Sequence, residues 1–282
     1  MVSQLSVQHA VKQLPLGQGI NFLKAHGNNP SLGDKLGYDE RINIPIIVES
    51  TDMEVLLSND DGIAAPGLRA LFEACDALGS GVQVRVVAPE ECHSAGGHRV
   101  TTERMLATRN HGEGWVGLDG TPADCVRVGL HGLNWKPDWV FSGINSGGNL
   151  GADVYLSGTV AAVREATIHG VRGIAFSHYL GRGQGFDWPR ATRWTRRVLA
   201  ALQGETLQPG EFWNVNFPSL PQDAPDPALV FCDHLGSSLH VAYQQVEGGF
   251  LYAGNYHARV RDPGSDVEAC FGGSIAISRV RL

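Results

Sequence analysis

Apolar and polar positions alternate in short blocks from residue 53 to the end of the chain, and these blocks predict a succession of strands and helices. Apolar runs with the length of buried strands lie at 53–58, 82–88, 115–118, 139–142, 173–177 and 213–217. Helical patterns lie between them at 66–78, 122–130, 157–169 and 190–202. Strands that alternate with helices predict an α/β fold with a doubly wound, mostly parallel sheet.

The two ends of the chain depart from this pattern. Residues 1–52 are broken repeatedly by Pro and Gly and hold three of the four lysines, so we interpret them as an N-terminal extension, partly disordered, before a domain at 53–282. Residues 231–266 loosen into aromatic, His and Gly residues, which predicts a C-terminal β-hairpin excursion. The chain closes with an alternating strand pattern at 273–280.

Composition narrows the function classes. The 282 residues are 43% hydrophobic and 18% charged, which is typical of a globular protein. A net charge of −7 argues against a nucleic-acid polymer as partner, and no apolar run approaches the roughly 20 residues that span a bilayer, so no membrane is expected. Five widely spaced cysteines without a CxxC pair, and no secretory signal pattern, indicate a cytoplasmic protein. Lys136 follows no GxxxxG loop, which excludes P-loop chemistry.

Two adjacent carboxylates follow the first strong strand, in the run Asn59-Asp60-Asp61-Gly62. Neighbouring carboxylates repel each other unless a cation lies between them, and oxygen ligands at such a position suit Mg²⁺ or Mn²⁺. Asn-Asp-Asp-Gly is also ordinary turn chemistry. By itself, the run leaves a metal site and a plain turn both open.

Two further loops offer polar groups after strands. The glycine-rich loop at 142–151 carries Asn145 and Asn149, whose side chains offer neutral oxygens or amide donors. The loop at 88–97 carries Ser94, whose hydroxyl could reach a metal or a phosphate. Each loop alone is equally compatible with an ordinary surface loop.

The run Ser157-Gly158-Thr159 opens a helix directly after the glycine-rich loop. A helix N-terminus with hydroxyls and unpaired amides is an anion site, although plain N-capping is the commoner role of such residues. Because a parallel sheet aligns the carboxyl ends of its strands, all four segments are expected to face one cleft. Together they predict one divalent metal ion, Mg or Mn, beside a phosphate pocket.

Long stretches of the chain resemble the SurE family of stationary-phase survival proteins. The matching segments are VLLSNDDGIAAPGLRAL after residue 54, DGTPADCVRVGL at 119–130, SGINSGGNLGADVYLSGTVAAVREA at 142–166, NVNFP at 214–218 and PGSDVEACFGGSIAIS at 263–278. The resemblance implies a Rossmann-like core and a metal-dependent phosphatase of nucleoside 5′- and also 3′-monophosphates. It further implies a homodimer or homotetramer formed through an exchanged C-terminal segment.

The resemblance also implies a set of site residues. The metal ligands would be Asp60, Asp61, Ser94 and Asn145, and Asp60 would also be the catalytic base or nucleophile. The phosphate-binding groups would come from five residues, namely Asn59, Asn149, Ser157, Gly158 and Thr159. In one departure from the family pattern, Ala95 follows Ser94 where the family usually has glycine.

Two other function classes remain open from the residues alone. A receiver-like signalling module also binds Mg²⁺ through an acidic pair after its first strand, but it needs a later Asp and Lys that the loop at 142–145 and the sequence beyond it lack. A metal-free nucleotide-binding protein fits if the acidic pair is only a turn. Phosphate release from AMP or GMP, with and without EDTA, distinguishes these classes.

Overall fold

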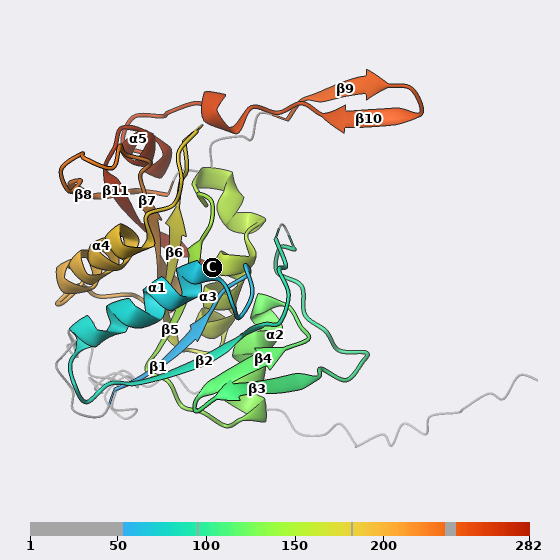
Figure 1. The fold of residues 1–282 in the computed structure, drawn as a ribbon, viewed down its shortest axis with the longest axis vertical. Helices are drawn as coiled ribbons and strands as arrows, with labels where there is room; N and C mark the ends of the chain where they lie inside the picture. The colour runs from blue at the N-terminus through green and yellow to red at the C-terminus, as the bar shows by residue number, and fades with distance from the viewer. Residues whose placement is uncertain (1–52, 95, 182, 235–240) are drawn as a thin grey trace, which may run out of the picture. The chain divides into compact units, whose positions relative to one another are not determined.

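The structure is a computed structural model that describes residues 53–94, 96–181, 183–234 and 241–282. The prediction of an N-terminal extension falls on residues 1–52, which lie outside the described residues. Within them, strands and helices alternate along most of the chain (Figure 1). The α/β fold predicted from the hydrophobic pattern is therefore confirmed.

The described residues form a nine-stranded sheet with the order β3-β4-β2-β1-β5-β6-β7-β11-β8. The six strands from β4 to β7 in this order run parallel, whereas β3 is antiparallel to β4, and β11 is antiparallel to β7 and parallel to β8. The bounds are β1 Glu54–Ser58, β2 Gln83–Pro89, β3 Thr108–Gly112, β4 Trp115–Leu118, β5 Trp139–Asn145, β6 Arg172–His178, β7 Glu211–Phe217, β8 Leu229–Asp233 and β11 Ile275–Arg281. The sheet is thus mostly parallel, with antiparallel strands toward both edges.

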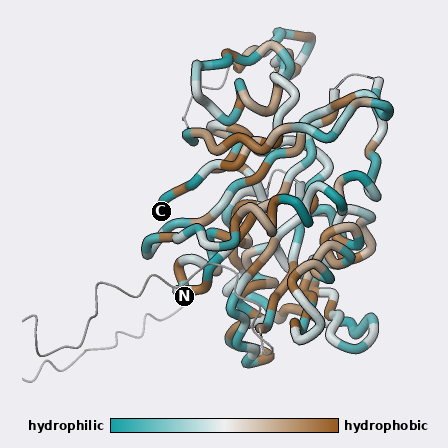
Figure 2. The backbone as a smooth tube through the Cα atoms, turned by 90° about the vertical axis from the view of Figure 1, so that its left-hand side faces the viewer, coloured by the Kyte–Doolittle hydropathy of each residue, from teal (hydrophilic) through white to brown (hydrophobic). Residues whose placement is uncertain are grey.

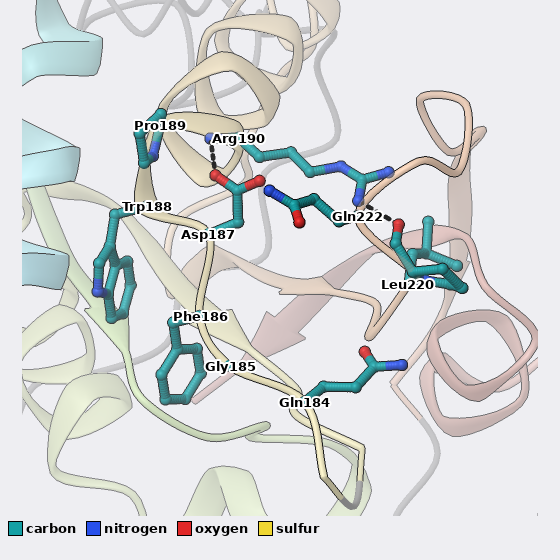
Figure 3. Close-up of a pocket in the computed structure, with 10 residues that line it drawn as sticks. Gln184, Gly185, Phe186, Asp187, Trp188, Pro189, Arg190, Leu220 and Gln222 are labelled. Carbon is teal, nitrogen blue, oxygen red and sulfur yellow. Dashed lines mark hydrogen bonds between the residues drawn. The ribbon is translucent and has the colours of Figure 1, made fainter.

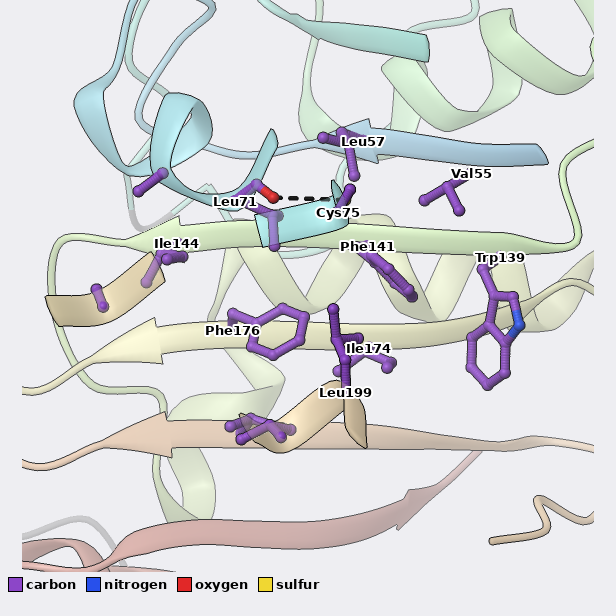
Figure 4. Packing of buried hydrophobic residues seen from close by; sticks show 14 of the residues in the cluster. Val55, Leu57, Leu71, Cys75, Trp139, Phe141, Ile144, Ile174, Phe176 and Leu199 are labelled. Carbon is purple, nitrogen blue, oxygen red and sulfur yellow. Dashed lines mark hydrogen bonds between the residues drawn. The ribbon is translucent and has the colours of Figure 1, made fainter. Parts of the chain in front are cut away.

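Helices cover both faces of the sheet because the buried strands are apolar on both sides. The helices are α1 Pro66–Ala74, α2 Pro122–Arg127, α3 Gly158–Ile168, α4 Trp188–Ala201 and α5 Asp266–Phe271. In β1, Val55 and Leu57 pack in the cluster that includes residues of α1 and α4 (Figure 4), whereas Leu56 packs with residues of α2 and α3. Figure 2 shows the resulting succession of hydrophobic and hydrophilic stretches along the backbone. This two-sided burial defines a doubly wound sheet.

The predicted hairpin excursion is also present. Strands β9 (Tyr243–Val246) and β10 (Gly249–Tyr252) pair antiparallel in a two-stranded sheet of their own. Every residue of this pair is exposed except Gly249, which is half-buried.

Three elements were not expected from the hydrophobic pattern, namely β3, β8 and α5. Strand β3 has the sequence TRNHG and is exposed throughout, so it carries no apolar signal. Helix α5 spans only six residues and starts from a Ser265 cap. Strand β3 is held by antiparallel pairing with β4, and α5 is held by its contacts with β11, β8 and β7.

Candidate active site

The predicted site residues come to one edge of the sheet because β1 and β5 are parallel neighbours. Ser58 at the end of β1 pairs with Ser142 of β5, and Asn145 pairs with Ser177 near the end of β6. The acidic pair that follows β1 therefore lies beside the glycine-rich loop that follows β5. This is the edge of an open α/β sheet at which ligands bind.

Asp60 is buried, with only 4% of its surface exposed. Its Oδ1 atom accepts a hydrogen bond of 2.5 Å from the Thr159 hydroxyl, and its main-chain oxygen accepts one of 2.7 Å from the His93 amide. A Cβ atom built on Gly158 would lie 2.9 Å from Oδ2 of Asp60, so only glycine allows the start of α3 to approach this closely. Burial, reinforced by the charge of Asp61, raises the pKa of Asp60 to about 6, despite the opposing hydrogen bond from Thr159.

Asp61 and Asn145 are joined through the main chain of the glycine-rich loop. Oδ2 of Asp61 accepts a hydrogen bond of 2.9 Å from the amide of Ser146, the residue after Asn145. The Asn145 side chain donates its amide nitrogen to the Gly147 oxygen at 2.9 Å, which leaves its amide oxygen as an acceptor. Asp61 is therefore fixed to the main chain of the residue that follows Asn145.

The loop that carries Ser94 is held beside the acidic pair by the residue before it, His93. The preceding residue, His93, is the one whose amide donates to the main chain of Asp60. Ser94 is exposed, and its hydroxyl lies 3.0 Å from the Cys92 sulfur. The loop after β2 thus passes next to the acidic pair with a hydroxyl open to solvent.

Three residues expected to bind phosphate use their side chains for hydrogen bonds within the protein. Asn59 exchanges hydrogen bonds of 2.8 and 3.3 Å with the main chain of Gly62, which has a φ of +104°. The Ser157 hydroxyl accepts from the Val160 amide at 3.1 Å and caps α3. The Asn149 side chain donates to the Ser177 hydroxyl at 2.8 Å.

The start of α3 remains as the anion-binding element. In the part of the chain that the structure describes, the amide of Gly158 has no hydrogen-bond acceptor, whereas the Thr159 main chain donates a hydrogen bond to the Asp60 side chain. Both residues are in contact with the Asp60 side chain. Unpaired amides at a helix N-terminus attract anions, so an anion bound there would lie next to the acidic pair.

A buried amide network behind the glycine-rich loop was missed by the sequence reasoning. The amide nitrogens of Asn214 and Asn216 donate to the Asn149 oxygen at 2.9 and 3.0 Å, and Oδ1 of Asn216 accepts from the Asn149 amide at 2.8 Å. Both residues are fully buried on β7. A signal was present in the sequence, since two asparagines at alternate positions of the apolar run FWNVNF must point to the same side of the strand.

A buried carboxylate on α3 was also missed. Glu165 lies 2.6 Å from His98, 2.5 Å from Arg127 and 2.9 Å from His169, measured from its carboxylate oxygens to their side-chain nitrogens. Although burial opposes ionisation, the hydrogen bonds from these three side chains lower the pKa of Glu165 to about 2. His98 belongs to the loop that carries Ser94, so Glu165 ties that loop to α3.

The donor set of the acidic pair fits a hard divalent cation. Two carboxylates, an amide oxygen and a hydroxyl are oxygen ligands of the kind that Mg²⁺ and Mn²⁺ accept. Among the described residues there is no group of three or more His, Cys, Asp and Glu side chains that could hold a metal ion. Any metal here would accordingly depend on Asn145 and Ser94 as well as on the two aspartates.

Comparison with known families decides what kind of protein carries this site. The family model described as "Survival protein SurE" matches residues 55–234, which include every candidate site residue. The chain belongs to the SurE family. This confirms the family resemblance of the sequence.

Several SurE relatives align with most of this chain. A protein of Nostoc sp. (strain PCC 7120) is 46% identical over 230 residues, which cover 82% of this chain and 100% of its own length. The 5′-nucleotidase SurE of Geotalea daltonii is 38% identical over 235 residues, covering 82% of this chain and 93% of its own. The crystal structure of the SurE protein from Aquifex aeolicus has a TM-score of 0.71 at 31% identity and covers 81% and 93% of the two chains. The SurE fold is therefore shared by this chain.

In this SurE protein, no helix of the described ranges is long and apolar enough to cross a membrane.

Proposed function

We propose that this chain is a metal-dependent phosphatase that hydrolyses nucleoside 5′-monophosphates to nucleoside and phosphate, with nucleoside 3′-monophosphates as a second substrate class. Relatives with the name 5′-nucleotidase SurE are 34–38% identical over most of this chain. As a member of their family, the chain is an enzyme of the nucleotidase type. The observation that carries the finer proposal is the contact of the buried Asp60 with the start of α3, because it puts a cation site and an anion site side by side.

The proposed metal is one Mg²⁺ or Mn²⁺ ion held by Asp60, Asp61, Ser94 and Asn145. When bound, such an ion supplies Lewis-acid stabilisation of a phosphate ester and lowers the pKa of coordinated water. The acidic pair needs this charge, because a phosphate dianion is repelled by two bare carboxylates.

The chain itself positions the ester. The start of α3 at Gly158 and Thr159 binds phosphate oxygens and stabilises the charge that shifts onto them in the transition state. The side chains of Asn59 and Ser157 hold the main chain on which these groups depend, and the Asn149 side chain donates to the Ser177 hydroxyl. We assign all three a positioning role in phosphate binding. Asp60 is the proposed catalytic residue, as the base for the attacking water or as the nucleophile.

Phosphate release from AMP, GMP and 3′-AMP tests the proposal, measured with Mg²⁺, with Mn²⁺ and with EDTA. Asp60→Asn and Asp61→Asn are expected to abolish metal-dependent release while circular dichroism shows an intact fold. Glu113→Gln, a change at an exposed Glu in the turn between β3 and β4, serves as the matched control and should retain activity. Full activity of either aspartate variant would refute the metal role.

The same assays separate the alternative functions. Nucleotide binding without phosphate release would favour a metal-free nucleotide-binding protein. A stable phosphoprotein formed from a small phosphodonor, without turnover, would favour a receiver-like signalling module.

We further propose that the protein works in the cytoplasm as a homodimer or homotetramer. The excursion around β9 and β10 exposes a run of large hydrophobic side chains, namely Val241, Tyr243, Val246, Phe250, Leu251 and Tyr252. Contiguous exposed apolar side chains mark association surfaces. Light scattering after size-exclusion chromatography tests this: Phe250→Asp should lower the molar mass, whereas the same change at Met105, which is 82% exposed outside the excursion, should not. An unchanged mass for Phe250→Asp would refute the role of the excursion.

A further inference from the structure

A recess of about 550 Å³ lies between the loops that follow β6 and β7. It is lined by residues 184–190 from the first loop and the beginning of α4, and by Leu220, Pro221 and Gln222 from the second loop (Figure 3). Its volume lies within the roughly 300–1,000 Å³ that is typical of small-molecule sites. None of the site residues discussed above lines it.

One wall of the recess is aromatic. The rings of Phe186 and Trp188 are stacked, with centroids 4.9 Å apart and planes at 21°. Both side chains are half-buried, and both residues line the recess. Behind them, the His178 ring lies 5.4 Å from the Phe186 ring, centroid to centroid. A flat, partly exposed aromatic stack of this kind is a platform for another planar ring.

The aromatic wall lies close to the end of β5. A Cβ atom built on Gly67 would lie 2.0 Å from the main-chain oxygen of Ile144 and 3.1 Å from the Trp188 ring. The indole edge therefore lies against the main chain one residue before Asn145. The absence of a side chain at Gly67 is what allows this approach.

The order of the strands sets the distance between the two sites. The carboxyl ends of β1 and β5 carry the acidic pair and Asn145, and those of β6 and β7 lead into the loops around the recess. With neighbouring strands spaced by about 4.8 Å, two strand spacings give a separation of about 10 Å. A nucleoside monophosphate separates its phosphate from its base by a similar length.

The polar groups of the recess suit a neutral ring rather than a second phosphate. The Gln184 amide oxygen accepts a hydrogen bond of 2.6 Å from the Ser219 hydroxyl, which leaves the amide nitrogen as a donor. Gln222 contributes a second, exposed amide. The guanidinium of Arg190 is buried and donates to the main-chain oxygens of Pro221 and Ala224 at 2.6 Å each, so its charge is already engaged.

We infer that the Phe186–Trp188 pair at this recess binds the base of the nucleotide, with the base stacked on the pair. The inference rests on the proposed function, since it assigns the base of the substrate whose phosphate lies at the start of α3. It makes Trp188 and Phe186 specificity-determining residues for nucleotides over other phosphate monoesters.

The test compares two substrates that carry the same phosphate ester, AMP and ribose 5-phosphate, which lacks a base. Trp188→Ala is expected to lower the ratio of kcat/KM for AMP to kcat/KM for ribose 5-phosphate roughly tenfold, the range of a lost base–aromatic stack. Trp188→Phe keeps an aromatic face and should retain most of the ratio. Trp135→Ala, at a half-buried tryptophan before the amino end of β5, is the matched control and should leave the ratio unchanged.

A second variant is included because Trp188 packs against Gly67, so that Trp188→Ala also removes a packing contact. Phe186→Ala removes the other ring of the stack and is expected to lower the same ratio, with folding checked by circular dichroism. An equal loss of activity on AMP and ribose 5-phosphate in both variants would overturn the inference.

Calorimetry with adenosine separates this inference from the proposed function, because adenosine has no phosphate to hydrolyse. Trp188→Ala should weaken adenosine binding roughly tenfold. Equal dissociation constants for the wild-type protein and Trp188→Ala would overturn the base site. Trp188-dependent adenosine binding in a protein that releases phosphate from neither ester would overturn the proposed function and support the base site.

Discussion

Replacing Glu165 by Gln removes one negative charge from the centre of a buried cluster and keeps the shape of the side chain. Glu165 is 1% exposed and accepts hydrogen bonds from His98, Arg127 and His169. Glutamine mimics the protonated carboxyl group, so the variant measures how strongly the fold favours the ionised form. We expect a clear loss of stability at neutral pH.

The magnitude follows from the pKa of Glu165. Its fall from 4.5 to about 2 corresponds, at 1.36 kcal/mol per unit, to about 3 kcal/mol of stabilisation of the charged form. Because the folded-state pKa lies below that of the unfolded chain, this contribution is fully present above pH 4.5 and is lost as the pH falls toward 2. The stability difference between wild type and Glu165→Gln should therefore be constant between pH 5 and 8 and should vanish in acid.

Guanidinium denaturation at a series of pH values measures this difference as a change in the free energy of unfolding. Glu113→Gln, at an exposed turn, controls for the loss of a carboxylate as such and should change stability by less than about 0.5 kcal/mol. A Glu165→Gln variant as stable as the wild type at pH 7, or a difference that persists unchanged at pH 2, would refute the reasoning.

Three further outcomes are expected. In EDTA, the Asp60→Asn variant should be more stable than the wild type by about 3 kcal/mol at pH 8 and equally stable at pH 4. The reason is that the folded-state pKa of Asp60 is about 6, so the wild-type protein loses stability as the pH rises through 6. Chemical denaturation at both pH values measures the difference, and equal stability at pH 8 would contradict the prediction. Gly158→Ala places a methyl group 2.8 Å from the Asp60 Cβ. It should lower kcat/KM for AMP at least about tenfold and the free energy of unfolding by about 1–3 kcal/mol. The control Gly249→Ala, whose added methyl group meets no described atom within 4 Å, should change neither quantity. Arg259→Ala removes hydrogen bonds of 2.6 and 2.8 Å to Asp153. It should lower the free energy of unfolding by about 2 kcal/mol and speed proteolysis at residues 241–260. An unchanged cleavage rate would show that this ion pair does not hold the excursion in place.

The predicted elements agree with the structure where hydrophobic and polar residues alternate regularly within the element. The run at 115–118 is β4 to the residue, and the helix predicted at 157–169 is α3 over Gly158–Ile168. The helix predicted at 66–78 ends earlier, since α1 stops at Ala74 and a 3-10 turn continues to Leu78. Strand β3 escaped prediction because it is polar and exposed along its whole length.

The sequence offers candidate site residues, whereas their contacts come from the fold. Adjacent carboxylates after a strand and a helix beginning with Ser157 can be read from the sequence. The Asn149 side chain donates to the Ser177 hydroxyl, 28 residues away, so its role depends on a partner that only the folded chain supplies.

The sequence by itself determined the α/β class, the hairpin excursion and the place of the acidic pair after the first strand, because each depends on a pattern within a few neighbouring residues. Only the tertiary structure decided the strand order and the contact of Asp60 with Thr159, which lies 99 residues away in the chain. It also decided the burial that raises the pKa of Asp60 and the recess between the loops after β6 and β7. These features depend on which strands become neighbours, and no local period of hydrophobic and polar residues encodes that choice.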